Sequence, residues 1–341
     1  MIRVVVVSGV RHAGEYLPVL LGRSDVEVVG LTEPPDGPDW ADEVTRALAE
    51  HHDLPYVPWP DLPDADVAVV TSEPTRHAAL AAECCRRGLD VIVDKPVATR
   101  TADAEMLRDV ARQTGRHVTV MSRCGTPAMQ RARRAVDSGQ VGMPRHVDFE
   151  LLSASALFAQ TVERPELILD PRWSGGGEIV NFFGYAVDAV RYLTGLEIVD
   201  LYCEAAPLTS PMHIEAGVED LAVVSMRLTN GGTASATVGR LPWVPAPGWA
   251  SVSVRLLGSH GHLQIDDSRP AVRRWRDATQ ESLPLVTSPA VETFGWTLDN
   301  LFAARAGGAP AYGLDDALAA TRATEGAVRS AAEHEVVTLV E

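Results

Sequence analysis

Apolar and polar residues alternate along the first third of the chain in a strand–helix rhythm. Short β-branched runs predict strands buried on both faces of a parallel sheet, at residues 2–7, 26–31, 67–70, 89–93 and 117–121. Helical patterns separate these runs and end at about residues 21, 51, 87 and 113. Strands that alternate with helices in this way predict βαβ units and a doubly wound sheet.

Beyond about residue 122 the pattern changes, because strand-like runs follow one another directly. They cover residues 145–152, 198–204, 221–228, 233–238, 251–257 and 262–266. Asn230-Gly231-Gly232 is typical of a hairpin turn. Helical patterns cover residues 178–193, 291–306 and 314–333. We therefore expect an α/β protein with a Rossmann domain at residues 1–122. An α+β domain with an open, mostly antiparallel sheet should follow at residues 123–341.

The composition is that of a soluble globular protein, with 46% hydrophobic and 22% charged residues in 341. A net charge of −16 argues against nucleic acid and anionic membranes as partners. The four cysteines show neither zinc-like nor disulfide spacing, and no metal site is predicted. A secretory signal and an apolar run of membrane-spanning length are not apparent, so we expect a cytoplasmic protein.

Lys95 is the single lysine of the chain, in which lysine and arginine together number 30. It lies between the run at residues 89–93 and Pro96, where we expect the carboxyl end of a strand. Ligands of open α/β sheets bind at that edge. Lysine suits proton transfer because its pKa changes readily on burial. A lysine left on the surface by chance is the alternative.

The strand followed by Asp94-Lys95-Pro96 resembles the signature of the Gfo/Idh/MocA family of nicotinamide-dependent sugar and polyol oxidoreductases. Residues 72–77 upstream and Gly175-Gly176-Gly177 downstream match the same family pattern. The resemblance implies an NAD-binding Rossmann domain and a substrate domain for a sugar-like molecule. It also implies a homodimer or homotetramer. In the family this lysine lies near the nicotinamide and the reacting oxygen, so Lys95 becomes a catalytic candidate.

The predicted phosphate loop departs from the usual Gly-x-Gly-x-x-Gly pattern. Residues 8–14 read Ser-Gly-Val-Arg-His-Ala-Gly, shorter by a few residues than the family loop and without its first two glycines. Ser8, Gly9, Arg11 and His12 are still candidates for the dinucleotide, through helix N–H groups and a charge-assisted contact from Arg11. A strand–helix turn that binds no nucleotide is the alternative.

Glu33 ends the second strand, where a carboxylate accepts hydrogen bonds from the adenosine ribose. It would repel a 2′-phosphate, and no arginine follows it closely, so NAD is favoured over NADP. A solvated loop acid is the alternative. The resemblance adds further residues on the cofactor side, with His77 structural rather than catalytic: Thr71, Ser72, Pro74, His77, Asp94, Lys95 and Arg123.

Asn181, Tyr185 and Asp188 share one face of the helix predicted after the three glycines. The resemblance places an aspartate at position 181 and a histidine acid/base at position 185, and both are replaced here. Asn181 can orient a substrate hydroxyl but cannot ionise. Tyr185 can exchange a proton, and a nearby lysine would favour its phenolate. A pocket that has lost its chemistry is the alternative.

Two further groups of residues are weaker candidates. His213, Glu215, Glu219 and Asp220 lack ligand-like spacing, and we interpret them as solvated loop charges. Trp243 and Trp249 could form the wall of a sugar site or an interface.

The main hypothesis is an NAD-dependent oxidoreductase acting on a secondary alcohol or ketone of a sugar-like substrate. Lys95 would polarise the oxygen, Tyr185 would exchange the proton and Asn181 would orient a hydroxyl. The alternative is a redox-inactive nucleotide- or sugar-binding regulator. A third possibility uses NAD for a transient oxidation inside a lyase or glycosidase cycle.

Overall fold

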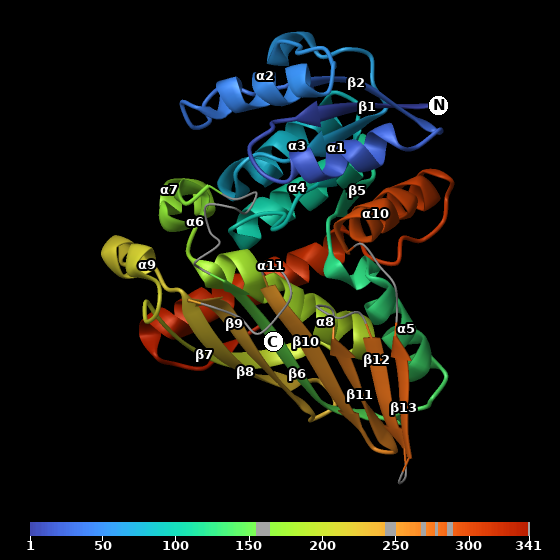
Figure 1. Cartoon of the computed structure of the whole chain (residues 1–341), viewed down its shortest axis with the longest axis vertical. Helices are drawn as coiled ribbons and strands as arrows, with labels where there is room; N and C mark the ends of the chain where they lie inside the picture. Colours follow the sequence, from blue (N-terminus) through green and yellow to red (C-terminus); the bar gives the residue numbers. More distant parts are fainter. Residues whose placement is uncertain (155–163, 243–249, 267–270, 277–278, 285–288, 340–341) are drawn as a thin grey trace.

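The computed structural model describes residues 1–154, 164–242, 250–266, 271–276, 279–284 and 289–339. These residues form two sheets with helices around and between them, and the N-terminal sheet lies above the C-terminal one in Figure 1. Within the part of the chain that is described, no helix combines the length and the apolar character needed to cross a membrane.

The N-terminal sheet is parallel and has the strand order β2-β1-β3-β4-β5. Its strands are β1 (Ile2–Val7), β2 (Val26–Thr32), β3 (Val67–Val70), β4 (Asp90–Val93) and β5 (Val118–Val120). Its helices are α1 (Ala13–Leu21), η1 (Trp59–Asp61), η2 (Pro74–Arg76), α2 (Ala41–His51), α3 (His77–Arg86) and α4 (Thr101–Thr114). Alternate valines of β1 enter two different apolar clusters, one on each face of the sheet. The predicted doubly wound sheet is confirmed.

The C-terminal sheet has nine strands in the order β13-β12-β11-β10-β6-β9-β8-β7-β14. They are β6 (Pro144–Ala154), β7 (Ile198–Ala206), β8 (Leu221–Leu228), β9 (Thr233–Leu241), β10 (Ala250–Gly258), β11 (Gly261–Asp266), β12 (Ala271–Arg276), β13 (Thr279–Pro284) and β14 (Val337–Thr338). Its pairs are antiparallel except for the central β6–β9 pair, which is parallel. The expected mostly antiparallel sheet is therefore confirmed.

The remaining helices join and cover the two sheets. They are η3 (Arg123–Gly125), α5 (Pro127–Asp137), α6 (Glu166–Leu169), α7 (Pro171–Ser174), η5 (Ile179–Phe183), α8 (Gly184–Thr194), α9 (Pro211–Ala216), α10 (Pro289–Arg305) and α11 (Leu314–Glu333). α8 and α11 pack on one face of the C-terminal sheet, and α11 also contacts α4 of the N-terminal part (Figure 1). α10 packs on α1 and β5, so it belongs to the N-terminal core although it lies late in the sequence.

The pattern of apolar residues does not predict every helix and strand. β12 and β13 form the polar edge of the C-terminal sheet and do not stand out by hydrophobic period. α5 is not predicted either, although it is amphipathic, because few of its buried residues are large: Ala128, Met129 and Ala132. β8, α2 and α11 have the predicted bounds.

Candidate active site

Lys95 follows β4 at the carboxyl edge of the parallel sheet and reaches across to the second part of the chain. Its Nζ donates to Asn181 Oδ1 at 2.6 Å and to the Asn181 carbonyl oxygen at 3.2 Å. The same Nζ lies 5.3 Å from the ring centroid of Tyr185 and 5.5 Å from that of Phe182. The structure thus brings together the three residues that the sequence suggests for catalysis.

The helix that carries Asn181 and Tyr185 begins with a π-helical turn. η5 is this π-helix, and the regular helix α8 starts only at Gly184. The single regular helix expected over residues 178–193 is therefore wrong at its start. π turns inside helices occur frequently at functional sites. Asn181, Tyr185 and Asp188 nevertheless line one cavity, as their predicted common face requires.

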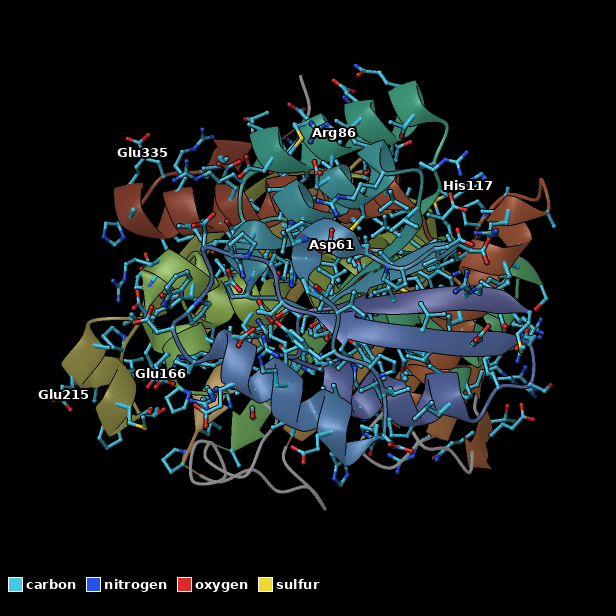
Figure 2. The ribbon with its side chains drawn as sticks, turned by 90° about the horizontal axis from the view of Figure 1, so that it is seen from above. Asp61, Arg86, His117, Glu166, Glu215 and Glu335 are labelled. Carbon is cyan, nitrogen blue, oxygen red and sulfur yellow. The ribbon has the colours of Figure 1, made fainter. Side chains whose placement is uncertain are left out.

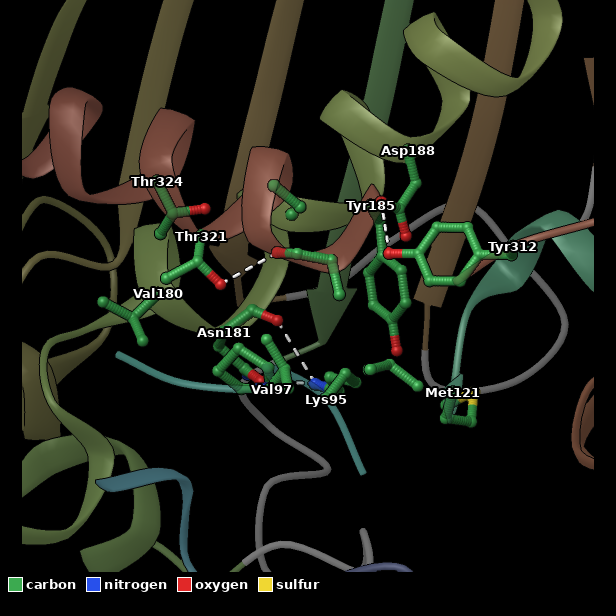
Figure 3. A pocket seen from close by; sticks show the side chains of 15 residues that line it. Lys95, Val97, Met121, Val180, Asn181, Tyr185, Asp188, Tyr312, Thr321 and Thr324 are labelled. Atoms are coloured by element: carbon green, nitrogen blue, oxygen red, sulfur yellow. Dashed lines mark hydrogen bonds between the residues drawn. The ribbon is translucent and has the colours of Figure 1, made fainter. Parts of the chain in front are cut away.

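This cavity lies between the end of β4 and the helices α8 and α11, and it is narrow, with a volume of about 30 Å³. Lys95, Asn181 and Tyr185 lie at one end, and the Tyr185 ring points toward Lys95 and Met121 (Figure 3). Apolar side chains form most of the remaining wall: Val97, Val120, Met121, Val180, Ala317 and Ala320. Apolar walls with a few polar groups at one end are typical of small-molecule sites. The volume itself corresponds to about two water molecules, so a polyol would need the walls to move apart.

Asp188 lies at the other end of the cavity, where Tyr312 donates a hydrogen bond to it (Figure 3). The Tyr312 hydroxyl is 2.8 Å from one carboxylate oxygen, and the Ser122 hydroxyl is 2.7 Å from the other. Burial raises the pKa of Asp188 to about 7, although both hydrogen bonds act in the opposite direction. Tyr312 could not be connected to this site from the sequence, because it lies in a loop far along the chain.

Arg123 lies in η3, directly after β5 and a short turn. Its guanidinium carbon is 5.8 Å from the ring centroid of Tyr185, so its charge also faces the cavity end occupied by Lys95. Two cations therefore flank the Tyr185 ring.

Asp94 is fully buried and held by protein groups. His12 Nδ1 lies 2.5 Å from one carboxylate oxygen, and the Tyr16 hydroxyl donates to the other at 2.7 Å. Burial alone would raise the pKa of Asp94, but the charges of His12 and Arg11 outweigh it and hold the pKa well below its usual value. Asp94, which the resemblance places on the cofactor side, lies between His12 and Tyr16.

The segment after β3 supports the turn that carries Lys95. His77 contacts the Pro96 carbonyl oxygen at 2.6 Å and the Ser72 carbonyl oxygen at 2.8 Å, and burial lowers its pKa. Pro74 opens η2. His77 therefore has the structural position expected for it.

The crevice where a doubly wound sheet binds its dinucleotide is bridged in this structure. Strand order reverses between β1 and β3, and ligands normally bind outside the carboxyl ends of these strands. The Arg11 N–H donates to the Thr71 carbonyl oxygen at 3.0 Å, and the Thr71 hydroxyl donates to the Ser8 carbonyl oxygen at 2.5 Å. The short loop after β1 therefore closes over the end of β3.

Two backbone donors at the start of the loop are also taken. Gly9 N–H donates to the Thr45 hydroxyl at 2.7 Å, and Val10 N–H lies 3.3 Å from the Ser8 hydroxyl. A methyl group added at Gly9 would lie 3.0 Å from Thr45 Cα, so there is little space beside this glycine for a phosphate group. An apolar cluster covers the loop, and it contains Val10, Trp40, Ala41, Leu167 and Trp173.

Arg11 fills the space between the loop and the catalytic candidates. It is 2% exposed, its terminal nitrogen lies 3.4 Å from Asn181 Oδ1, and its Nε lies 3.9 Å from Asp94. The guanidinium thus crosses from the first part of the chain to the second, directly beside Lys95.

Glu33 is buried rather than solvated. The Thr45 hydroxyl donates to it at 2.6 Å, an Arg76 nitrogen lies 3.4 Å away, and burial raises its pKa. No arginine follows Glu33 closely in the sequence, but η2 brings Arg76 beside it from another part of the chain. In this conformation several polar groups of the residues after β1 and β2, among them those of Thr71, Gly9 and Glu33, are paired within the protein.

The sequence reasoning missed a buried charged cluster behind Asn181. Glu178 accepts a hydrogen bond from Asn181 Nδ2 at 3.0 Å, forms an ion pair with Arg240, and lies 3.2 Å from His213 Nε2. Glu178, His213 and Arg240 are all fully buried. One hint was available, since an arginine inside an apolar strand such as β9 requires a buried acidic partner.

The interpretation of residues 213–220 as a solvated loop is wrong for most of its members. His213 lies on the helix α9 and points inward to Glu178, while Glu215 lies at the periphery (Figure 2). Asp220 is buried and accepts hydrogen bonds from three successive backbone N–H groups. Among the residues with described positions, no group of three histidine, cysteine, aspartate or glutamate side chains could hold a metal ion. Trp243 and Trp249 lie outside the described residues.

Two family models match the chain. Residues 2–122 match the oxidoreductase family with an NAD-binding Rossmann fold, and residues 129–264 match the GFO/IDH/MocA C-terminal domain.

Curated relatives match a shorter part. The uncharacterized oxidoreductase YrbE of Bacillus subtilis is 25% identical over 231 residues, 66% of this chain and 64% of that protein. The scyllo-inositol 2-dehydrogenase (NAD(+)) of the same organism is 21% identical over 232 residues, 67% of this chain and 64% of that protein. The chain thus spans less than two thirds of the length of these relatives.

Solved structures match nearly end to end. An aldose-aldose oxidoreductase from Caulobacter crescentus, complexed with glycerol, has a TM-score of 0.79 at 21% identity and 99% coverage of both chains. A levoglucosan dehydrogenase in complex with NADH has a TM-score of 0.81 at 17% identity, with 100% of this chain and 99% of that chain covered. At these identities the likeness shows the fold. Together with the two family models, it establishes that the chain belongs to the Gfo/Idh/MocA family of oxidoreductases, whose N-terminal domain is an NAD-binding Rossmann fold.

Proposed function

We propose that the chain interconverts a secondary alcohol and a ketone on a cyclic polyol or sugar, with NAD as its redox partner. The observation that carries the proposal is the meeting of Lys95, Asn181 and Tyr185 at one end of a largely apolar cavity. The inositol, aldose and levoglucosan enzymes among its relatives are named for hydroxyl-rich molecules, which supports this substrate class.

Each of the three side chains has a role that its chemistry permits. The Lys95 ammonium donates a hydrogen bond to the reacting oxygen, which favours its alkoxide character. The Tyr185 hydroxyl exchanges the proton of that oxygen. Asn181 orients a neighbouring substrate hydroxyl through its amide group. NAD, once bound, supplies the oxidising equivalent.

Substitution of the two proton-handling residues tests the roles. In an assay of NADH formation with a panel of inositols and sugars, Lys95→Ala and Tyr185→Phe should each lower kcat by roughly 100-fold to 10,000-fold, the usual contribution of general acid–base catalysis. NADH affinity should stay nearly unchanged in both variants. Tyr202→Phe is the matched control, because Tyr202 lies on β7 and its hydroxyl contacts Glu204 rather than the cavity. Full turnover in Tyr185→Phe would remove Tyr185 from the mechanism.

Cofactor preference is part of the proposal. Titration calorimetry with NADH and NADPH should give tighter binding of NADH, because the Glu33 carboxylate would repel a 2′-phosphate. Equal affinities would show that Arg76, only 3.4 Å from Glu33, offsets this repulsion.

The bridged crevice favours a second candidate function. A redox-inactive sugar-binding regulator would need neither a free phosphate loop nor the usual aspartate and histidine, and Arg11 already fills the space beside Lys95. This candidate predicts that the purified protein binds a polyol in calorimetry but neither NADH nor NADPH. Binding of NADH together with turnover would eliminate it.

We also propose a homodimer or homotetramer that forms through the outer face of the C-terminal sheet. That face is rich in short polar contacts, such as Ser235 to Asp148 at 2.7 Å. Light scattering of the purified protein would test the proposal, and a monomer at micromolar concentration would contradict it. A cytoplasmic location, where NAD is available, is part of the same proposal.

A further inference from the structure

Asn181 can accept a hydrogen bond from Lys95 with its side chain in only one of the two orientations of its amide group. Lys95 Nζ and the Arg11 guanidinium are both donors, at 2.6 Å and 3.4 Å from the side-chain oxygen. A rotation of the amide by 180° would place its NH₂ group against two cations. Some neighbour must therefore hold the oxygen on the Lys95 side.

Glu178 is that neighbour. Its carboxylate oxygen Oε2 accepts a hydrogen bond from Asn181 Nδ2 at 3.0 Å, and a carboxylate can only accept. With Glu178 on one side and Lys95 on the other, the flipped amide would meet an acceptor with its oxygen and a donor with its nitrogen. Both contacts would be repulsive in a site where all three side chains are at most 9% exposed.

Two buried side chains, those of Arg240 and His213, hold Glu178 in place. Arg240 of β9 and His213 of α9 both contact its other oxygen, Oε1, and Arg240 also donates to the Ser153 hydroxyl at 3.1 Å. Glu178, His213 and Arg240 have no exposed surface. The carboxylate therefore cannot turn away from Asn181 without disturbing its ion pair with Arg240, which is costly between two fully buried groups.

We propose that Glu178 is a positioning residue, held by Arg240 and His213, that orients the Asn181 amide so that its oxygen receives Lys95. Its effect on turnover rests on the proposed function, whereas its effect on Lys95 does not. The family resemblance places an aspartate at position 181. Here Asn181 takes that position, and the carboxylate of Glu178 accepts a hydrogen bond from its amide. The line of contacts runs from Arg240 through Glu178 and Asn181 to Lys95.

Because Lys95 is the single lysine, labelling with ¹⁵N,¹³C-lysine gives one side-chain signal without any assignment step. The first variant is Glu178→Asp, which keeps the charge beside Arg240 but withdraws the carboxylate from Asn181 by one methylene. Glu178→Gln is the second variant. Glu219→Asp is the matched control, because Glu219 is a neighbouring, partly buried carboxylate that accepts a hydrogen bond from the Ile179 N–H rather than from Asn181.

In Glu178→Asp the Lys95 Nζ and Cε resonances should move to the positions that they have in Asn181→Ala. The double variant should add nothing further, because both substitutions interrupt the same contact. Glu219→Asp should leave the signals where they are in the wild type. With a polyol that turns over, Glu178→Asp should lower kcat roughly 10-fold to 100-fold, the range expected for a lost hydrogen bond to a charged group.

Unchanged Lys95 signals in both Glu178 variants would overturn the proposal, and so would additive shifts in the double variant. If Glu178→Gln does not fold, the Lys95 signals of Glu178→Asp and of the double variant Glu178→Asp/Asn181→Ala suffice to test the role of Glu178. Absence of turnover in every protein, wild type included, would contradict the proposed oxidoreductase, while the Lys95 signals would still decide the role of Glu178.

Discussion

At the scale of single residues, Arg11 has the largest consequence for the proposed function. Its backbone N–H closes the crevice between β1 and β3, and its guanidinium lies between Asp94 and Asn181. A dinucleotide entering the usual crevice would have to displace this side chain. We therefore expect NAD to bind a conformation in which Arg11 has withdrawn.

Arg11→Ala should accordingly increase the affinity for NADH. Removal of a competing side chain raises the fraction of protein able to bind, and hydrogen bonds with a charged partner contribute about 1.5–3 kcal/mol, so the Kd should fall roughly tenfold or more. Titration calorimetry on the wild type and the variant measures the change.

Arg172→Ala is the control, since Arg172 is an exposed arginine on α7 that pairs with Asp170 rather than with the loop. It should leave the Kd unchanged. If Arg11→Ala binds NADH more weakly than the wild type, Arg11 holds the cofactor instead of excluding it, and the phosphate-loop role expected from the sequence would be restored.

At the scale of secondary-structure elements, Asp188 on α8 should make stability depend on pH. Its pKa is about 7 in the folded protein, against a usual 3.8. Between these values the folded protein keeps a proton that the unfolded chain has released, so the free energy of unfolding falls as the pH rises from about 4 to about 7. A shift of about three units corresponds to at most about 4 kcal/mol.

Asp188→Asn should remove this loss, because an amide does not titrate. Denaturant unfolding at pH 5 and pH 8 measures the free energy of unfolding of both proteins. The value of the variant relative to that of the wild type should be higher at pH 8 than at pH 5. Asp61→Asn, at an exposed position, should follow the wild type at both values. A parallel pH dependence in wild type and Asp188→Asn would mean that Asp188 is ionised in the folded protein throughout.

Elements with a strong local pattern could be predicted from the sequence, and those set by distant contacts could not. β1 is a continuous apolar run, and its bounds agree with the prediction. The buried position of His213 depends on its contact with Glu178, which pairs with Arg240, and these three residues lie far apart in the sequence. Lys95, Asn181 and Tyr185 were found because a family resemblance marked their positions, whereas Glu178 lies outside that pattern.

At the scale of the whole molecule, the chain's C-terminal part completes the domain that its N-terminal part begins. Phe294 of α10 is fully buried, and its ring stacks on Tyr16 with centroids 4.1 Å apart. Tyr16 donates its hydroxyl to Asp94, next to Lys95. A residue near the end of the sequence thus supports the residues beside the catalytic lysine.

Phe294→Ala should therefore destabilise the protein by about 3–5 kcal/mol, the usual cost of truncating a buried phenylalanine. Phe302→Ala is the matched control on the same helix, because Phe302 is only half-buried and should cost less. Guanidinium unfolding measures both. Equal losses in the two variants would mean that the stacking on Tyr16 contributes little. A loss confined to Phe294→Ala would show that residues 1–122 depend on α10, so that cutting the chain after the parallel sheet would remove part of the core on which the Lys95 turn rests.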